Sequence, residues 1–214
     1  MTKIDDGQRT KVEHRREVSL VLPPDGGGAQ FFDPIVQGAH WLTLFLMICL
    51  FSTAALAEAG LPDAAKLIVI QLHRSFGLTL WGVTLLRLIW RQFAEFPDWP
   101  ANLPRRLRIA ASAAEYLLYG LLLLQPILGL LYTNARGNVV HFYLLVRIPP
   151  LIAQHKELGE KLIAAHAFVA SVLLIVIAMH ASMMLYRHFA RRENTLNRML
   201  PKALRSQARQ AWPL

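Results

Sequence analysis

Four histidines lie inside long apolar stretches of the sequence, where an ionisable side chain is costly. His166 and His180 occur in "LIAAHAFVASVLLIVIAMHASMMLYRH", His40 occurs in "GAHWL", and His73 occurs in "IQLHRSFG". An imidazole within a membrane span needs a partner in the protein interior, so its presence indicates a functional site. Two imidazoles at one depth on different helices are suited to the two axial positions of a haem iron.

The spacing of His166 and His180 places them on one face of a helix. At a rise of about 1.5 Å and a rotation of about 100° per residue, fourteen residues advance about 21 Å and end about 40° short of four turns. Because successive spans run in opposite directions, His73 shares a depth with His166, and His40 shares a depth with His180. We therefore predict two pairs, His73/His166 and His40/His180, stacked across the membrane.

A hydrogen-bonding role and a zinc site are the alternatives to haem for these histidines. A single histidine in a span is often explained by a hydrogen bond to a neighbouring helix, but four histidines in matched pairs favour a shared ligand. Zinc prefers four ligands, and Glu115 is the only acidic or cysteine side chain that the spans place near the histidines. Haem fits the pairing better, and an iron with two histidine ligands favours electron transfer over oxygen binding.

The histidines require membrane-spanning helices, and the composition predicts them. Hydrophobic residues make up 54% of the 214-residue chain, more than a soluble core needs. Four runs reach the roughly 20 residues that cross a bilayer. They are Gln37–Ala57, Leu67–Trp90, Ala110–Tyr132 and Leu162–Tyr186. The predicted fold is an all-α membrane protein with a bundle of four transmembrane helices.

The distribution of positive charge predicts the orientation of these spans. The net charge is +9, and most Lys and Arg residues lie in the N-terminal tail, between the second and third spans, or after Tyr186. The exceptions flank the first and third loops: Lys66, Arg74, Arg136, Arg147, Lys156 and Lys161. This positive-inside pattern places both termini in the cytoplasm. No nucleic-acid-binding motif accompanies the charge, so nucleic acid is not an expected partner.

The chain divides into a single membrane domain with two polar tails. Residues 1–34 carry charges of both signs and the sequence "PPDGGG", which predicts a flexible cytoplasmic tail rather than a cleavable signal peptide. Residues 35–190 form the predicted four-helix domain. The basic residues 191–214 are expected in the cytoplasm, either solvated or lying on the anionic leaflet as an interfacial segment.

Several residues beside the histidines are candidates for a supporting role. Arg87 follows His73 by fourteen residues, so it is placed to pair a haem propionate near His40 and His180. Snorkelling to the interface is the alternative for Arg87. Arg74 and Arg136 are similar candidates near His73 and His166.

The remaining polar residues near the spans are given plainer roles. Gln125 and Pro126 interrupt the third span, which predicts a proline kink or, alternatively, a quinone contact. We expect the histidines outside the two pairs to be solvated: His14, His141, His155 and His188.

The sequence resembles the bacterial cytochrome b561 family over roughly Pro34–Pro201. The resemblance rests on "HW" at His40, on "HRSFG" at His73 with Arg87 beyond it, on "ARGN" after the third span, and on the last two histidines followed by "ENTLNRMLP". It implies that the four histidines ligate two haems b. It also implies ubiquinone as the partner in the lipid phase and the bacterial inner membrane as the location.

The resemblance leaves two candidate electron donors. Some relatives oxidise superoxide at the external face, and others take electrons from an attached dehydrogenase. The predicted function is a transmembrane dihaem cytochrome that moves electrons between a periplasmic donor, superoxide as the first choice, and ubiquinone. The alternative is a haem-bearing cytochrome b subunit or accessory protein of a larger respiratory complex.

Overall fold

The computed structural model describes residues 31–96, 104–191 and 195–200 of the chain. The predicted tails 1–34 and 191–214 lie largely outside the described residues, as does His14. Within the described part, four long helices and one short helix are present. They are α2 (Pro34–Ala57), α3 (Asp63–Trp90), α4 (Arg105–Ala135), α5 (Lys156–Phe189) and α6 (Thr195–Met199).

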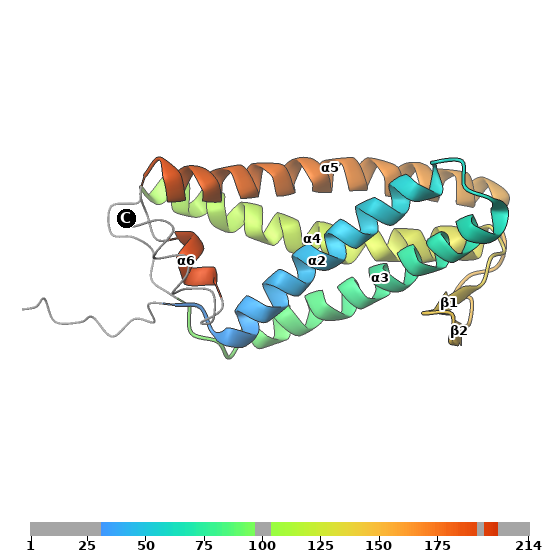
Figure 1. Cartoon of the computed structure of the whole chain (residues 1–214), viewed down its shortest axis with the longest axis horizontal. Helices are drawn as coiled ribbons and strands as arrows, with labels where there is room; N and C mark the ends of the chain where they lie inside the picture. The colour runs from blue at the N-terminus through green and yellow to red at the C-terminus, as the bar shows by residue number, and fades with distance from the viewer. Residues whose placement is uncertain (1–30, 97–103, 192–194, 201–214) are drawn as a thin grey trace, which may run out of the picture.

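The four long helices lie side by side, with α2 against α3, α3 against α4, and α4 against α5 (Figure 1). Each predicted apolar run lies within one of them, which confirms the mostly helical prediction. The helices extend beyond the apolar runs because hydropathy marks only the part suited to lipid. The charged first turns of α4 and α5 are helical as well.

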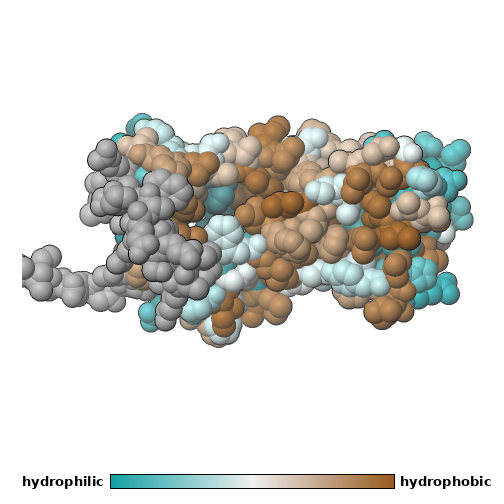
Figure 2. Space-filling model, in the orientation of Figure 1, coloured by the Kyte–Doolittle hydropathy of each residue, from teal (hydrophilic) through white to brown (hydrophobic). Residues whose placement is uncertain are grey.

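Among the described residues, three helices are long and apolar enough to cross a membrane, namely α2, α4 and α5. Much of their apolar surface is exposed, and Figure 2 shows brown apolar side chains across the middle of one face. The helix α3 is long enough, but Gln71, His73 and Arg74 lower its hydropathy. Three of the four predicted spans are therefore confirmed as helices that could cross a membrane.

A small leucine-rich core lies midway along the helices. Leu173 is seven residues from both His166 and His180, so the core separates the two levels at which the histidines lie. The buried members are Leu46, Met47, Leu80, Leu121, Leu122 and Leu173.

The mostly helical fold also contains a β-hairpin after α4, which the sequence did not predict. Strand β1 (Val140–Phe142) pairs antiparallel with β2 (Val146–Ile148). The turn holds Tyr143 and Leu144 at φ 48° and 65°. Neither is glycine, so this left-handed conformation costs about 1–2 kcal/mol at each residue and requires contacts that hold it. The hairpin lies beside the beginning of α3, and we call this end of the helices the hairpin end (Figure 1).

The opposite end is closed by α6, and we call it the α6 end. The side-chain amide of Gln37 donates hydrogen bonds to the main-chain carbonyls of Phe32 (2.8 Å) and Arg198 (3.1 Å). The indole nitrogen of Trp41 donates to the carbonyl of Met199 (3.0 Å). These bonds tie the chain beyond α5 to the first turns of α2, and they give the "HW" motif a structural role.

The "ARGN" motif ends α4 with a Schellman motif. The main-chain N–H of Gly137 donates to the carbonyl of Asn134 (2.8 Å), and that of Asn138 donates to the carbonyl of Thr133 (3.0 Å). Gly137 has φ 75°, the left-handed conformation that this cap requires. The side chain of Asn134 also accepts a hydrogen bond from the N–H of Leu151 (2.8 Å), so the cap organises the connector beyond the hairpin.

We predict that Gly137→Ala lowers the free energy of unfolding by about 1–2 kcal/mol, because alanine is strained at positive φ. Its Cβ would also lie 2.9 Å from the Gln154 side chain. Gly38→Ala in α2 is the matched control, since nothing lies within 4 Å of its Cβ position. It should leave the free energy of unfolding unchanged or raise it by up to about 1 kcal/mol. Denaturation in detergent micelles measures both. Equal stability of Gly137→Ala and the wild type would contradict the left-handed conformation of Gly137 in this cap.

Candidate functional site

The structure brings His73 of α3 and His166 of α5 together near the hairpin end. Their ring centroids are 6.3 Å apart, and the ring planes are inclined by 69°. Two imidazole nitrogens that bind one metal from opposite sides at about 2 Å each place their ring centres roughly 6 Å apart. The separation of this pair therefore fits one metal between the two rings.

The hydrogen bonds of the two rings decide which nitrogen faces a metal. The Nδ1 of His73 lies 3.1 Å from the carbonyl oxygen of Leu50 and 3.1 Å from the hydroxyl of Thr53. The Nδ1 of His166 lies 3.2 Å from the carbonyl oxygen of Gln125. A carbonyl only accepts, so Nδ1 carries the proton in both rings and Nε2 has the lone pair. Metal-binding histidines are oriented in this way by main-chain carbonyls.

Helix α4 is shaped around His166. A Cβ at Gly129 would lie 3.1 Å from Cε1 and 3.3 Å from Nδ1 of His166, so glycine permits the close approach. The side chain of Gln125 donates a hydrogen bond to the carbonyl of His166 (3.0 Å), which fixes α4 against α5. The sequence predicts only a kink or a quinone contact at Gln125. The sequence feature that indicates this packing is Gly129, four residues after Gln125 and on the same face of an apolar helix.

The second pair, His40 of α2 and His180 of α5, lies toward the α6 end. Both rings are half-buried and within electrostatic range of Arg87, and His180 also interacts with Glu115. The guanidinium of Arg87 donates a hydrogen bond to the hydroxyl of Thr43 (2.9 Å). The structure thus holds Arg87 between helices at the level of this pair, as the fourteen-residue spacing predicts, rather than fully exposed at a helix end.

The two other candidate arginines lie at the hairpin end. Arg74 is half-buried, and its guanidinium donates to the carbonyl of Val139 at 3.5 Å. Arg136 is exposed, and its side-chain carbons pack against Gly159, where a Cβ would lie 3.1 Å from Cδ. Arg74 therefore contacts the hairpin, whereas Arg136 presents its charge at the surface.

The histidines outside the two pairs differ in part from the prediction that they are solvated. His155 is exposed and caps α5, since its Nδ1 accepts a hydrogen bond from the N–H of Leu158 (3.2 Å). His141 is half-buried in β1. His188 is only 2% exposed, so the prediction is wrong there, because the last turn of α5 packs against the chain around it. Its ring lies 4.9 Å from that of Phe189.

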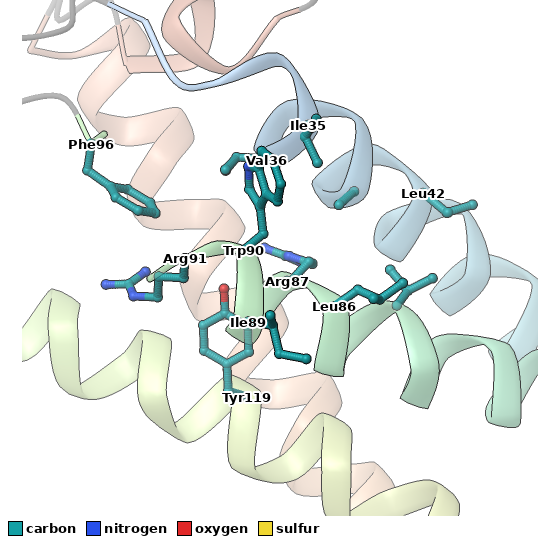
Figure 3. Close-up of a pocket in the computed structure, with 12 residues that line it drawn as sticks. Ile35, Val36, Leu42, Leu86, Arg87, Ile89, Trp90, Arg91, Phe96 and Tyr119 are labelled. Atoms are coloured by element: carbon teal, nitrogen blue, oxygen red, sulfur yellow. The ribbon is translucent and has the colours of Figure 1, made fainter. Parts of the chain in front are cut away.

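A pocket of about 370 Å³ lies near Arg87, and Figure 3 shows that α2, α3 and α4 all contribute to it. Besides Arg87, its polar or aromatic residues include Trp90, Arg91 and Tyr119, and Arg91 forms an ion pair with Glu115. Burial lowers the pKa of Arg91, but Glu115, Tyr119 and Tyr116 together outweigh this effect and raise the pKa above its usual value. The lining residues are Ile35, Val36, Ala39, Leu42, Val83, Leu86, Arg87, Ile89, Trp90, Arg91, Phe96 and Tyr119.

The zinc alternative has no support in the described part of the chain. No group of three or more His, Cys, Asp or Glu side chains there is arranged to hold a metal ion. Paired histidines on different helices, with Nδ1 of His73 and His166 directed to main-chain carbonyls, would instead hold a haem through their free nitrogens. A helical membrane protein with such pairs near both ends of its helices is of the class that carries electrons through b-type haem.

The chain belongs to the prokaryotic cytochrome b561 family, whose pattern matches residues 32–202. Cytochrome b561 homolog 2 of Escherichia coli (strain K12) is 27% identical over 165 residues, which cover 77% of this chain and 88% of that protein. The probable superoxide oxidase CybB of Yersinia pestis is 28% identical over 166 residues, covering 77% and 93%. Cytochrome b561 homolog 1 of E. coli (strain K12) is 26% identical over 165 residues, covering 76% and 93%.

Membership confirms the resemblance seen in the sequence. The chain is an electron-transfer membrane protein of this family, and the family implies b-type haem. Quinones and redox proteins are the partners expected for such a protein.

We predict that Gly129→Ala perturbs the His73/His166 site alone, because the new Cβ pushes the His166 ring out of place. Gly120→Ala is the matched control in the same helix, since nothing lies within 4 Å of its Cβ position. Electron paramagnetic resonance of the oxidised holoprotein should show one altered low-spin haem signal in Gly129→Ala and none in Gly120→Ala. Identical spectra for Gly129→Ala and the wild type would contradict this packing.

Proposed function

We propose that the chain is a transmembrane dihaem cytochrome b that transfers electrons from a periplasmic donor, superoxide, to ubiquinone in the bacterial inner membrane. In this proposal α2, α3, α4 and α5 all cross the membrane, within the predicted domain of residues 35–190. The tails 1–34 and 191–214 are cytoplasmic, and the hairpin end faces the periplasm. The observation that carries the proposal is the pair of histidine sites on opposite sides of the leucine core.

Each histidine pair has a defined role in this proposal. His73 and His166 hold one haem, and His40 and His180 hold the other. Haem supplies reversible one-electron chemistry at its iron when it is bound. The carbonyls of the neighbouring helices orient the rings at the hairpin end, and the leucine core keeps water out of the roughly 21 Å between the two levels.

Three arginines are proposed to bind the carboxylates of the cofactor. Arg87 suits this role at the α6 end because it lies near His40 and His180 and its position is fixed by Thr43. Arg74 and Arg136 are the candidates at the hairpin end. A planar guanidinium matches a carboxylate well, and pairing of this kind positions a cofactor as well as neutralising its charge.

The pocket beside Arg87 is the proposed ubiquinone site. Its walls are mostly apolar, as an isoprenoid quinone requires, and Trp90 and Tyr119 add aromatic surface. Arg87 belongs both to the pocket and to the surroundings of His40 and His180, so a quinone there would lie close to the second electron-carrying site. Reduction to quinol takes two electrons and two protons, and each of two superoxide ions supplies one electron and leaves as O₂.

Two observations support superoxide as the donor. The Yersinia pestis relative carries the name probable superoxide oxidase, and it matches 77% of this chain. The hairpin end also has a modest excess of positive charge, which attracts a small anion. The basic residues there are Lys66, Arg74, Arg136, Arg147, Lys156 and Lys161, and the acidic residues are Glu58, Asp63, Glu157 and Glu160.

We predict that His180→Ala removes or alters only the haem at the α6 end, because its partner His40 lies far from the other pair. The reciprocal variant His166→Ala should affect only the haem at the hairpin end. Redox titration of the visible spectrum distinguishes the two haems, and circular dichroism checks that the helices remain folded. Loss of both haems in a folded His180→Ala protein would count against the assigned pairs.

We predict that superoxide reduces the purified cytochrome and that quinone reoxidises it. The rate of reduction should fall as ionic strength rises, because salt screens the attraction of the anion. Arg136→Glu should slow reduction several-fold at low salt, whereas Arg105→Glu, the same change at the α6 end, should not. Stopped-flow absorbance measures both rates.

Two results would contradict parts of this function. If the rate of reduction by superoxide changes neither with salt nor in Arg136→Glu, electrostatic steering is wrong. If superoxide fails to reduce the protein while a co-purifying dehydrogenase succeeds, the chain is instead the haem-bearing subunit of a larger respiratory complex.

A further inference from the structure

The polar face of α3 at the hairpin end is occupied by the edge of β1. Gln71 donates to the carbonyl of Val139 (3.1 Å) and accepts from the N–H of His141 (3.2 Å). Ser75 accepts from the N–H of Tyr143 (2.7 Å), and its hydroxyl, which donates to the carbonyl of Gln71 in its own helix (2.9 Å), lies 3.4 Å from the carbonyl of His141. Three main-chain groups on this edge of the hairpin, the carbonyl of Val139 and the N–H groups of His141 and Tyr143, are therefore satisfied by side chains of α3.

The hairpin folds back along the side of α3 instead of projecting beyond its end. The hydroxyl of Tyr143 lies 2.9 Å from that of Thr79, and its ring lies 6.0 Å from that of Phe76. Thr79 is sixteen residues into α3, or about 24 Å along the helix axis from Asp63. The hairpin thus runs along the first part of α3, and the Tyr143 side chain reaches further along the helix to Thr79.

The tip of the hairpin is apolar and exposed. Leu144, Leu145 and Val146 are 52%, 85% and 59% exposed. The left-handed conformations of Tyr143 and Leu144 form the tight turn that presents these side chains. An exposed cluster of this kind marks a surface that meets another apolar phase.

The outer edge of β2 limits how deep this tip can lie. His141 pairs with Arg147, and the N–H and carbonyl of His141 point to α3, so this is a non-hydrogen-bonded pair. The main-chain groups of Arg147 consequently point away from β1. Such groups are not tolerated in hydrocarbon but are hydrated among lipid headgroups, where the Arg147 guanidinium would also meet phosphate.

We propose that the hairpin is a membrane-interface anchor, with Leu144, Leu145 and Val146 inserted among the lipid chains of the leaflet at the hairpin end and Arg147 at the phosphates. This inference rests on the proposed topology, in which α3 crosses the membrane. It also explains why α3 carries polar residues here, because Gln71, Ser75 and Thr79 form hydrogen bonds with a hairpin that lies against the helix at membrane depth.

The test uses the full-length holoprotein in lipid nanodiscs with an environment-sensitive dye on a single cysteine. Leu145→Cys is made in a Cys49→Ala background, and Ala59→Cys, in the exposed loop between α2 and α3, is the matched control. Lipids carry a quenching spin label either near the headgroup or near the chain end, and iodide is the aqueous quencher. Labelling of Ala59→Cys by an impermeant thiol reagent in right-side-out vesicles reports the topology separately.

The dye at position 145 should emit at shorter wavelength than the dye at position 59. It should be quenched several-fold more by the label near the headgroup than by the label near the chain end, and it should resist iodide. Equal iodide quenching at both positions would overturn the anchor, as would shielding from iodide without quenching by either lipid label. If Ala59→Cys reacts only from the cytoplasmic side, the proposed orientation of the function fails, whereas the anchor is decided by the quenching at position 145.

Discussion

The arrangement of this chain depends on the cost of placing imidazoles among apolar helices. A polar side chain there must find partners inside the protein, since lipid offers none. At the hairpin end, the partners of the two rings are main-chain carbonyls of Leu50 and Gln125, each on a neighbouring helix. Helix α4 approaches closely enough to supply one of them because Gly129 has no side chain. The ring orientations thus follow from how the helices pack.

Each end of the helices is secured by chain segments that lie outside the apolar runs. At the hairpin end, the Schellman motif at Gly137 turns the chain toward the hairpin, and α3 binds the edge of β1. At the α6 end, Gln37 and Trp41 bind carbonyls of the chain beyond α5. These contacts constrain the helices that carry the histidines. They also give the motifs that accompany the four histidines in the sequence a structural role.

Hydropathy and spacing predicted the helices and the level of each histidine because these features are local or follow from alternating helix direction. The sequence could not reveal which carbonyl meets which ring, since this depends on which helices are neighbours. The hairpin was missed because its strands are three residues long and its edge is satisfied by α3. The burial of His188 was missed for a related reason: a histidine near the end of an apolar run appears solvated until the chain around it is placed.

The central claim is that the two histidine pairs each hold one haem b. The most direct measurement is the molar ratio of haem to polypeptide in the purified protein, from the pyridine haemochrome spectrum and quantitative amino-acid analysis. Two matched pairs predict two haems b per chain. A ratio of one or zero in folded protein that has been supplied with excess haem would contradict the claim.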